Sequence, residues 1–393
     1  MTALPVIIVG AGPVGLALGL ALARRNIPVA VYETLDSLST EARASTFHPR
    51  TLEMLAEWGA LPSLLAHGYT VDRLQFWERH SRELVAEFDY RLIANDTPYP
   101  FRLQCPQSTL TQVLKPMLEA HPCASVHMGH TFLRYHETPE GIEAVFACSD
   151  GREVRVRGAY LCGADGSKSA VRRETGTTFE GMTYEDRFLL VASDIKLKHL
   201  FTDFAPVCYL FDPQEWVIVL HLPDVTRIVF RLKDDEADSV AHDETAIRER
   251  IANFVGVDLP YTIRGVSIYR VHQRVAGTFH MGRVLLLGDA AHINNPMGGM
   301  GMNSGIHDAY TLAPALAHAL QTGDVSTLAE WAEARRAFAL QDIQAHTDKQ
   351  YKDMSATEAH YRALRNQNLR DTARDPILAR HYLLKASMLE ERA

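Results

Sequence analysis

Hydrophobic residues are most concentrated near the start of the chain, where residues 5–23 carry no charged side chain. Residues 4–9 form a short apolar run rich in β-branched side chains, which is typical of a buried parallel strand. Residues 14–23 are apolar almost all round and predict a buried helix, and residues 27–32 predict a second strand. Because strand, helix and strand follow one another, the sequence predicts a βαβ unit and a parallel sheet.

A moderate alternation of hydrophobic and polar residues indicates a different kind of sheet further along the chain. Turn residues at 212–214 and 223–224 separate some of these runs in the manner of hairpins. The runs are residues 70–79, 84–90, 209–211, 216–221 and 227–232. They predict an antiparallel or mixed sheet with a covered face.

The chain beyond Asp324 contains no glycine and a single proline, Pro376. Residues 327–351 and 376–391 are rich in helix-forming side chains, which predicts a helical C-terminal region. We expect these helices to pack on the core or to form a dimer surface.

Composition narrows the class of protein. The 393 residues carry a net charge of −8, so a nucleic acid is not an expected partner. The uncharged stretch 5–23 is nearly long enough to span a membrane, but its four glycines and two prolines argue against this, and no basic segment precedes it. The five cysteines form no CxxC pair, which favours free thiols in a reducing compartment. We expect a cytoplasmic protein without a membrane segment.

The first motif with chemical meaning is Gly10-Ala-Gly12-Pro13-Val14-Gly15, between the first strand and the buried helix. Such glycines permit a tight turn, approach of the backbone to a pyrophosphate, and close packing of helix on strand. Glu33 ends the second strand, where a carboxylate can accept hydrogen bonds from ribose hydroxyls. This motif alone leaves NAD and FAD equally open.

Two later motifs lie at the ends of further strands. In residues 160–172, Asp165 and Gly166 turn the chain ahead of a helix, although Ser167 or Ser169 could serve there simply as a helix N-cap. In residues 282–292, an apolar strand carries Asp289 to its carboxyl end, where ligands bind in open α/β sheets. A glycine-rich loop, residues 295–303, then leads into a helix expected from Asn303 to Leu320.

The order and spacing of the three motifs resemble those of the class A flavin-dependent aromatic hydroxylases, which have the p-hydroxybenzoate hydroxylase fold. The resemblance covers most of residues 1–322. It implies a Rossmann-like FAD-binding domain with a parallel sheet, at residues 1–68, 100–178 and 276–322. A mixed β-sheet substrate domain would occupy 69–99 and 179–275, and 323–393 would form the helical C-terminus.

The resemblance also implies roles for particular residues. Those expected to bind FAD are Gly10, Gly12, Pro13, Val14, Gly15, Glu33, Arg43, Gln107, Asp165, Gly166, Asp289, Pro296, Gly299, Gly301, Met302 and Asn303. The segment 294–302, Asn-Asn-Pro-Met-Gly-Gly-Met-Gly-Met, departs from the Pro-Pro-Thr-Gly form common in the family. No second complete GxGxxG is present, so NADH or NADPH is expected to bind transiently, and the sequence does not choose between them.

The implied reaction is hydroxylation of a small phenolic or heteroaromatic compound by O2 and NAD(P)H through a flavin C4a-hydroperoxide. His48 is the candidate base, and Tyr209, His221 and Arg231 are candidates for contact with the substrate. Arg102 could meet a carboxylate, although for each of these residues an ordinary structural role is also open. No metal site is expected, and the protein could be a monomer or a homodimer.

Two alternatives remain open from the sequence. The substrate could instead be a larger polycyclic or antibiotic molecule. In a different class, the chain could be a flavin- or ligand-binding protein without catalytic activity.

Overall fold

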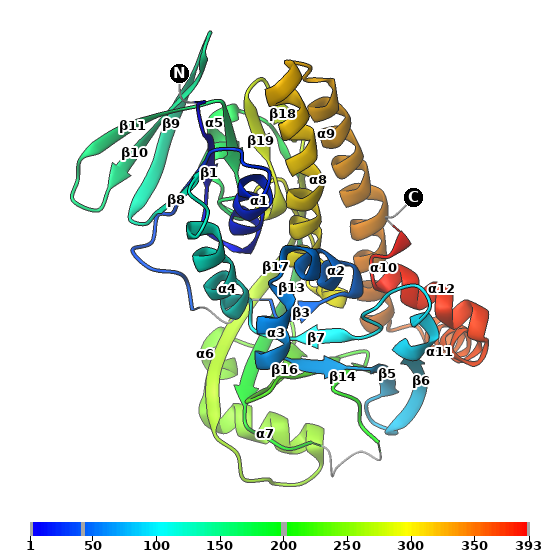
Figure 1. Ribbon diagram of the computed structural model, residues 1–393. Helices are drawn as coiled ribbons and strands as arrows, with labels where there is room; N and C mark the ends of the chain where they lie inside the picture. The colour runs from blue at the N-terminus through cyan, green and yellow to red at the C-terminus, as the bar shows by residue number, and fades with distance from the viewer. Residues whose placement is uncertain (1–2, 41–43, 198–202, 391–393) are drawn as a thin grey trace.

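The computed structural model describes residues 3–40, 44–197 and 203–390 (Figure 1). A six-stranded sheet in the order β18-β19-β12-β1-β2-β8 forms its first layer. Its strands are β1 (Val6–Val9), β2 (Val29–Tyr32), β8 (Ala124–His127), β12 (Tyr160–Gly163), β18 (His280–Met281) and β19 (Val284–Leu286). All neighbours except the β18–β19 hairpin are parallel, which confirms the predicted parallel sheet.

Helix α1 (Pro13–Ala23) is buried along its whole length after Pro13, as its uniformly apolar sequence predicts. It packs against α4 (Gln107–Glu119) and α8 (Gly301–Thr322), so that protein covers it on several sides. Shorter elements complete this part of the molecule: β3 (Thr46–Phe47), α2 (Pro49–Trp58), α3 (Leu61–His67), β4 (Tyr69–Val71), β7 (Arg102–Gln104) and α5 (Ala170–Thr175). A separate antiparallel sheet, β9 (His130–Thr138), β10 (Gly141–Cys148) and β11 (Glu153–Gly158), was not distinguished in the sequence.

The second large sheet has eight strands in the order β20-β17-β13-β16-β15-β14-β5-β6. Its strands are β5 (Arg73–Glu78), β6 (Glu83–Asp89), β13 (Phe179–Ser193), β14 (Val207–Phe211), β15 (Val217–His221), β16 (Thr226–Arg231), β17 (Ile263–Ala276) and β20 (His292–Ile293). Only the β14–β5 pair is parallel, so the predicted mixed sheet and both predicted hairpins are confirmed. The turn η1 (Tyr90–Ile93) follows β6, and helices α6 (Asp238–Ala241) and α7 (Glu244–Val255) lie beside the sheet.

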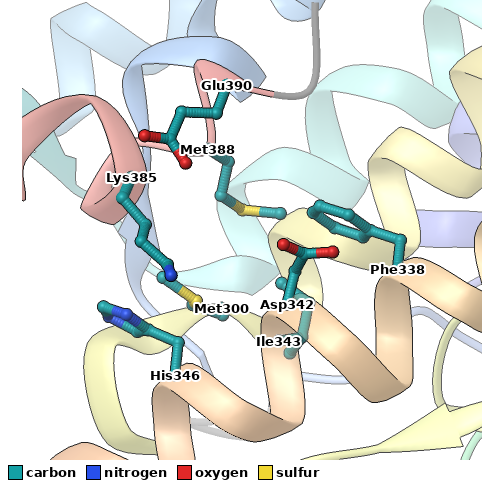
Figure 2. Close-up of a pocket in the computed structure, with 8 residues that line it drawn as sticks. All are labelled: Met300, Phe338, Asp342, Ile343, His346, Lys385, Met388 and Glu390. Atoms are coloured by element: carbon teal, nitrogen blue, oxygen red, sulfur yellow. The ribbon is translucent and has the colours of Figure 1, made fainter. Parts of the chain in front are cut away.

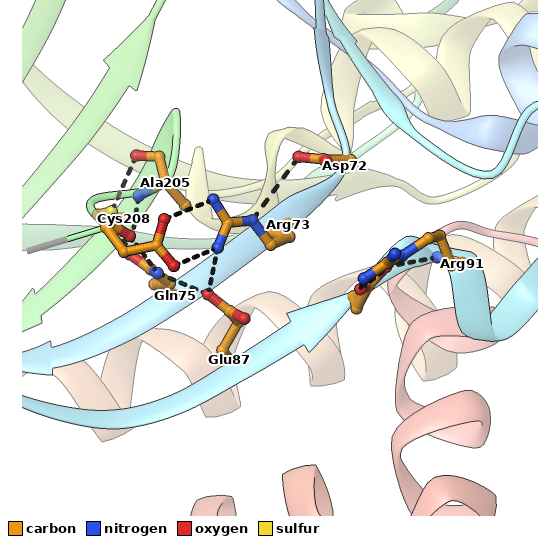
Figure 3. A network of polar contacts seen from close by, with 9 residues as sticks. Asp72, Arg73, Gln75, Glu87, Arg91, Ala205 and Cys208 are labelled. Carbon is orange, nitrogen blue, oxygen red and sulfur yellow. Dashed lines mark hydrogen bonds and ion pairs between the residues drawn. The ribbon is translucent and has the colours of Figure 1, made fainter. Parts of the chain in front are cut away.

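The parallel β14–β5 junction is fixed by a polar network (Figure 3). The buried side chain of Gln75 donates to Glu87 at 2.6 Å and accepts the N–H of Ala205 at 2.8 Å. Arg73 donates to Asp203 at 2.7 Å and to Glu87 at 3.2 Å. Because a parallel pair has no hairpin to set its register, these side-chain bonds tie the two distant segments together.

The C-terminal region is helical, as predicted. It comprises α9 (Ser326–Phe338), a π-helical segment η4 (Ala339–Gln344), α10 (Ala345–Met354), α11 (Ala359–Arg374) and α12 (Pro376–Ala386). Met354, Ala379 and Leu383 share a core cluster with Tyr209 and Phe211 of the eight-stranded sheet. The last helices therefore cover that sheet. Among the described residues, no helix is long and apolar enough to cross a membrane.

A buried carboxylate joins the turn after β19 to two helices. Asp308 of α8 accepts the N–H of Gly288 at 2.9 Å, His292 Nε2 at 2.8 Å and Arg335 Nε of α9 at 2.7 Å. Asp308 itself is fully buried. Burial opposes ionisation, but the charges and hydrogen bonds of His292, Arg335 and Gly288 outweigh it and lower the pKa of Asp308 to about 2.

Replacing Asp308 by Asn should destabilise the fold by about 3–5 kcal/mol, because Arg335 would remain buried without its counter-charge. Chemical denaturation near neutral pH would measure this loss. Since the folded pKa lies below the ordinary value, the carboxylate contributes stability above about pH 4 that disappears as the pH falls through about 2. The difference between wild type and variant should therefore shrink only in strong acid.

Glu333→Gln is the matched control, because this exposed residue of α9 loses the same charge without leaving a buried partner. Its stability should stay within about 0.5 kcal/mol of wild type. Equal stability of Asp308→Asn and wild type would refute the role given to Asp308.

Candidate functional site

The three motifs meet at the carboxyl edge of the parallel sheet. Val9 of β1 lies opposite Gly163 of β12, and Gly163 lies opposite Leu286 of β19. The segments that begin at Gly10, Ala164 and Leu287 therefore leave three adjacent strands at the same level. This is the edge at which open α/β sheets bind their ligands.

In the turn between β1 and α1, two glycines are packed tightly against backbone atoms and a third faces open space. A Cβ on Gly10 would lie 2.5 Å from the carbonyl oxygen of Ala164, and one on Gly15 would lie 1.9 Å from that of Gly10. A Cβ on Gly12, by contrast, would meet no protein atom within 4 Å. The first N–H groups of α1 face this open space and carry the positive end of the helix dipole, an arrangement suited to a pyrophosphate.

Glu33 lies directly after β2 and supports the same turn. One carboxylate oxygen accepts the N–H of Ala11 at 2.8 Å, and the other accepts the N–H of Leu35 at 3.0 Å. Each carboxylate oxygen has a second lone pair that remains available to a ribose hydroxyl.

Asp165 serves a local purpose in the second motif. Its carboxylate accepts hydrogen bonds from Ser169 Oγ at 2.5 Å and from the N–H of Ala170 at 2.6 Å, so it holds the start of α5. Burial raises the pKa of Asp165. Ser169 is the helix N-cap, as the sequence allowed. Gly166 has φ of +78° with open space around its Cα.

Arg172 connects the second motif to the third. Its guanidinium donates to the carbonyl oxygens of Ser167 at 2.8 Å and Ala290 at 2.9 Å. Ala290 follows Asp289, which is exposed. Arg172 thus fixes the two loops together, which only the assembled fold shows.

The loop from Pro296 to Asn303 leads directly into α8. Gly298 and Gly299 both have positive φ, and a Cβ on Gly299 would lie 2.9 Å from Cβ of Thr46. Helix α8 begins at Gly301, so the N–H groups of Gly301, Met302 and Asn303 have no acceptor within the helix. The side-chain oxygen of Asn294 lies by Gly301, buried and without a protein partner.

The side chain of Asn303 is committed to the protein. Its oxygen accepts the N–H of His48 at 3.0 Å, and its nitrogen donates to the carbonyl oxygens of Thr46 at 2.8 Å and Gly299 at 2.7 Å. Any contact between Asn303 and a ligand must therefore come from its backbone. Gln107, the other residue expected near a flavin, is half-buried at the start of α4, and Arg43 lies outside the described residues.

His48 is fully buried beside this loop. Its Nε2 lies 2.8 Å from the carbonyl oxygen of Gly298, which requires Nε2 to carry a proton and leaves Nδ1 as an acceptor. Nδ1 has no hydrogen-bond partner within the part of the chain that the structure describes. Burial, reinforced by the charge of Arg102, lowers the pKa of His48 well below 6.5, so the imidazole is neutral.

Several other buried polar atoms near His48 also lack protein partners. They belong to the side chains of Tyr90, Arg102, His346, Gln350 and Ser387. Gln350 is placed by Gly298, because a Cβ there would lie 3.0 Å from its side-chain oxygen. Tyr90 and Ser387 are neighbours that fall short of hydrogen-bond geometry. Such a cluster indicates a place where a polar ligand or water completes the bonding.

The three substrate residues expected from the sequence lie in different surroundings. Tyr209 stacks on Phe76 at 5.2 Å and faces the cluster around Arg102. His221 packs edge-on against Tyr69, and its Nδ1 lies 3.1 Å from Thr226 Oγ1. Arg231 donates to Asp186 at 2.6 Å and to the Gln214 carbonyl at 2.9 Å, so it has a structural role in the sheet.

The C-terminal helices supply side chains that sequence analysis assigned to packing on the core or to a dimer surface. His346 and Gln350 come from α10, and Tyr382 comes from α12. Helix periodicity alone does not reveal that these positions face a polar cluster. A cavity of about 150 Å³ opens between these helices and Met300 of the loop, with His346 and Lys385 in its wall (Figure 2).

The geometry fits FAD: open space before α1, a carboxylate after β2, and free N–H groups at the start of α8. Among the described residues, no group of His, Cys, Asp or Glu is arranged to hold a metal ion.

Comparisons with known proteins agree with this geometry. A family model described as an FAD binding domain matches residues 3–346. The chain is 30% identical over 392 residues to para-nitrophenol 4-monooxygenase of Pseudomonas sp. strain WBC-3, covering 98% of this chain and 96% of that protein. It is also 30% identical over 334 residues to 6-hydroxy-3-succinoylpyridine 3-monooxygenase of Pseudomonas putida strain S16, covering 84% of each.

A solved structure gives the same result. The crystal structure of p-nitrophenol 4-monooxygenase from Pseudomonas putida DLL-E4 superposes with a TM-score of 0.89 at 27% identity, covering 98% of both chains. Both sheets and the helical C-terminus thus have counterparts in a known monooxygenase. The protein with this sequence belongs to the class A FAD-dependent aromatic hydroxylases and is an FAD-dependent monooxygenase.

Proposed function

We propose that this hydroxylase acts on a small phenol or hydroxypyridine, with NADH or NADPH and O2 as co-substrates. The observation that carries the proposal is the buried cluster of unpartnered polar atoms beside His48 and the Pro296–Asn303 loop. Aromatic side chains of the eight-stranded sheet surround it, including Tyr209, Phe211 and Phe188. An aromatic ring with polar substituents has the complementary chemistry.

Two observations favour a small substrate over a polycyclic one. Helices α10 and α12 pack directly on the sheet, with Met354 and Leu383 in its core cluster, which limits the space above the sheet. The two relatives that this chain covers to 96% and 84% of their length are named for a nitrophenol and a pyridine.

The roles of the cofactor-binding residues follow from their positions. We propose that Gly10, Gly12 and Gly15 bind the pyrophosphate of FAD with Pro13, Val14 and the start of α1, and that Glu33 binds the ribose. Asp289 would bind the ribityl chain, and Gln107, Asp165 and Gly166 would also contact the cofactor. The same role is proposed for Arg43 from the family resemblance alone, since it lies outside the described residues. Pro296, Gly299, Gly301, Met302 and the backbone of Asn303 would border the ring. Bound FAD would accept hydride from NAD(P)H and activate O2 for the transfer of one oxygen atom to the substrate.

The chain's own residues have three tasks in this reaction. The free N–H groups at the start of α8 provide positive potential beside the cofactor. The C-terminal helices exclude water from the covered face of the sheet. His48 Nδ1 accepts the proton of a phenolic hydroxyl, which increases the electron density of the ring.

We also propose the domain division expected from the sequence, because the parallel strands β1, β2, β8, β12 and β19 all come from residues 1–68, 100–178 and 276–322. The strands of the other sheet come mainly from 69–99 and 179–275, and 323–393 forms the helical cover. A cytoplasmic location and a monomeric or homodimeric state remain proposals.

The substrate class is tested by aerobic consumption of NADH and NADPH with panels of nitrophenols, hydroxypyridines and polycyclic phenols. We expect a small phenol or hydroxypyridine to stimulate consumption strongly, with little hydrogen peroxide, and an oxygen atom from labelled O2 to appear in the product. Strong coupling only with polycyclic compounds would reject the proposed substrate class.

The variant Gly12→Ala should weaken FAD binding about tenfold or more, equivalent to about 1.4 kcal/mol, because the new methyl group enters the space assigned to the pyrophosphate. The stability of the apoprotein should not change, since no protein atom lies within 4 Å of that Cβ. Fluorescence titration of the apoprotein with FAD measures the affinity.

Gly265→Ala on β17 is the control, because its Cβ would also meet nothing within 4 Å. Its affinity for FAD should match that of wild type. If Gly12→Ala bound FAD with unchanged affinity, the pyrophosphate would not pass Gly12.

His48→Asn should lower kcat about 10²- to 10⁴-fold with phenols whose hydroxyl group is not ionised at the pH of the assay. The loss should be much smaller with 4-nitrophenol at a pH where it is already ionised. Because the pKa of His48 lies well below 6.5, the wild-type rate should not fall as the pH drops through 6.5 on account of this residue. Steady-state kinetics of the two substrates at several pH values would test both points.

His307→Asn is the control, because His307 is an equally buried histidine that lies near Thr51 rather than in the cluster. Equal losses with ionised and protonated phenols would show that His48 acts structurally.

A further inference from the structure

Arg102, on β7, is 2% exposed and is the most deeply buried arginine among the described residues. Two other buried arginines, Arg335 and Arg365, bind the carboxylates of Asp308 and Glu78. A further one, Arg172, donates to the backbone carbonyl oxygens of Ser167 and Ala290. Arg102 has no carboxylate partner among the described residues, and its Nε lacks any hydrogen-bond partner. A buried charge without a counter-charge is costly, so a residue of this kind indicates a ligand.

The neighbours of Arg102 are hydrogen-bonding groups without negative charge. Its guanidinium lies 5.7 Å from the ring centre of Tyr90, and Tyr209 and Tyr382 are close enough to influence it electrostatically. Burial raises the pKa of Tyr90 to about 12 and also raises that of Tyr382, so both phenols are neutral near pH 7. Burial likewise lowers the pKa of His346 to about 4. Among the described residues, the charge within the cluster is therefore that of Arg102. Beyond His346 lie Lys385 and Lys349, and the carboxylates of Asp342 and Glu390 line the same cavity as His346 and Lys385.

Strand pairing places this charge beside the candidate base. Thr46 lies opposite Gln104 and Phe47 opposite Leu103 in the antiparallel β3–β7 pair. The next position in this register sets His48 opposite Arg102, and the charge of Arg102 is one cause of the lowered pKa of His48. A substrate oxygen between the two residues could release its proton to Nδ1 of His48 and retain its negative charge next to the guanidinium.

We propose that Arg102 anchors the ionised oxygen substituent of the aromatic substrate, with the hydroxyls of Tyr90 and Tyr382 as additional donors, so that the enzyme selects aromatic anions over neutral analogues. This inference rests on the proposed function and names the substrate class of the same site. A guanidinium suits this task because it presents several donors in a plane toward one anionic group.

The test is equilibrium binding to the FAD-loaded enzyme, monitored by the flavin spectrum without turnover. The probes are 4-nitrophenolate and 4-hydroxybenzoate, each compared with its neutral methyl ether or methyl ester. Wild type should bind at least one of the anions more tightly than its neutral analogue. The two anions distinguish a phenolate from a carboxylate as the recognised group.

Arg102→Met and Arg102→Gln should weaken binding of the preferred anion about 10- to 100-fold and leave binding of its neutral analogue nearly unchanged. The affinity of 4-nitrophenol in these variants should also stop rising as the phenol ionises. Arg79→Met is the control, since it removes a half-buried arginine elsewhere, one that follows β5 of the eight-stranded sheet, pairs with Glu215 and packs near Phe254 of α7.

The proposal is overturned if wild type binds every anion no more tightly than its neutral analogue, or if both Arg102 variants retain the wild-type ratio of anion to analogue affinity. The wild-type ratio needs no variant, so the test stands even if neither variant binds FAD. Failure of the proposed function would look different: aromatic anions would bind through Arg102, but no hydroxylated product would form.

Discussion

The site depends on the bonds that converge on the buried carboxylate of Asp308. By accepting from Gly288, His292 and Arg335, this one side chain fixes the turn after β19 to α8 and α9. The same turn exposes Asp289, and the same helix begins with the free N–H groups next to the Pro296–Asn303 loop. A carboxylate held ionised in the interior thus sets the position of two parts of the cofactor site that are separated in sequence. Arg172 adds the third part, because it joins the Asp165 loop to Ala290.

The two large sheets contribute differently to chemistry. The parallel sheet brings its three loops to one edge through strand register, where backbone and small residues are available for contact with a ligand. The eight-stranded sheet instead offers a covered aromatic face, and the polar atoms near it come from β7, the β3–α2 junction, η1, α10 and α12. Because these elements are far apart in the chain, the residues of each can be substituted without altering the sequence motifs of the FAD site. Short motifs are therefore enough to identify the cofactor, whereas identification of the substrate requires the side chains that the fold brings together.

This difference explains how much the sequence could predict. The βαβ start, the parallel and mixed sheets, both hairpins and the helical C-terminus follow from local hydrophobic patterns, and the structure confirms them. The π-helical segment within residues 327–351 and the β9–β11 sheet did not stand out, because neither has a pattern distinct from its neighbours. Glycine spacing predicted the three loops that meet at one edge of the parallel sheet, since backbone geometry imposes those residues directly. It could not show that the side chains of Asn303 and Asp165 form hydrogen bonds within the protein, because those bonds depend on how the chain folds around them.

The cluster around Arg102 was the least accessible to sequence analysis, for a physical reason. An arginine in a sequence is usually paired or exposed, and only the assembled fold shows whether a carboxylate reaches it. Here the surrounding groups are phenols and neutral imidazoles, so among the described residues one positive charge in the interior has no counter-charge. Desolvation of that charge lowers the stability of the folded state, and a bound anion would offset this loss. The same charge lowers the pKa of His48 and so keeps Nδ1 unprotonated, and a substrate anion beside the guanidinium would offset this charge when the proton moves to Nδ1. Charge selection and proton acceptance are therefore coupled properties of one strand pair, β3 and β7.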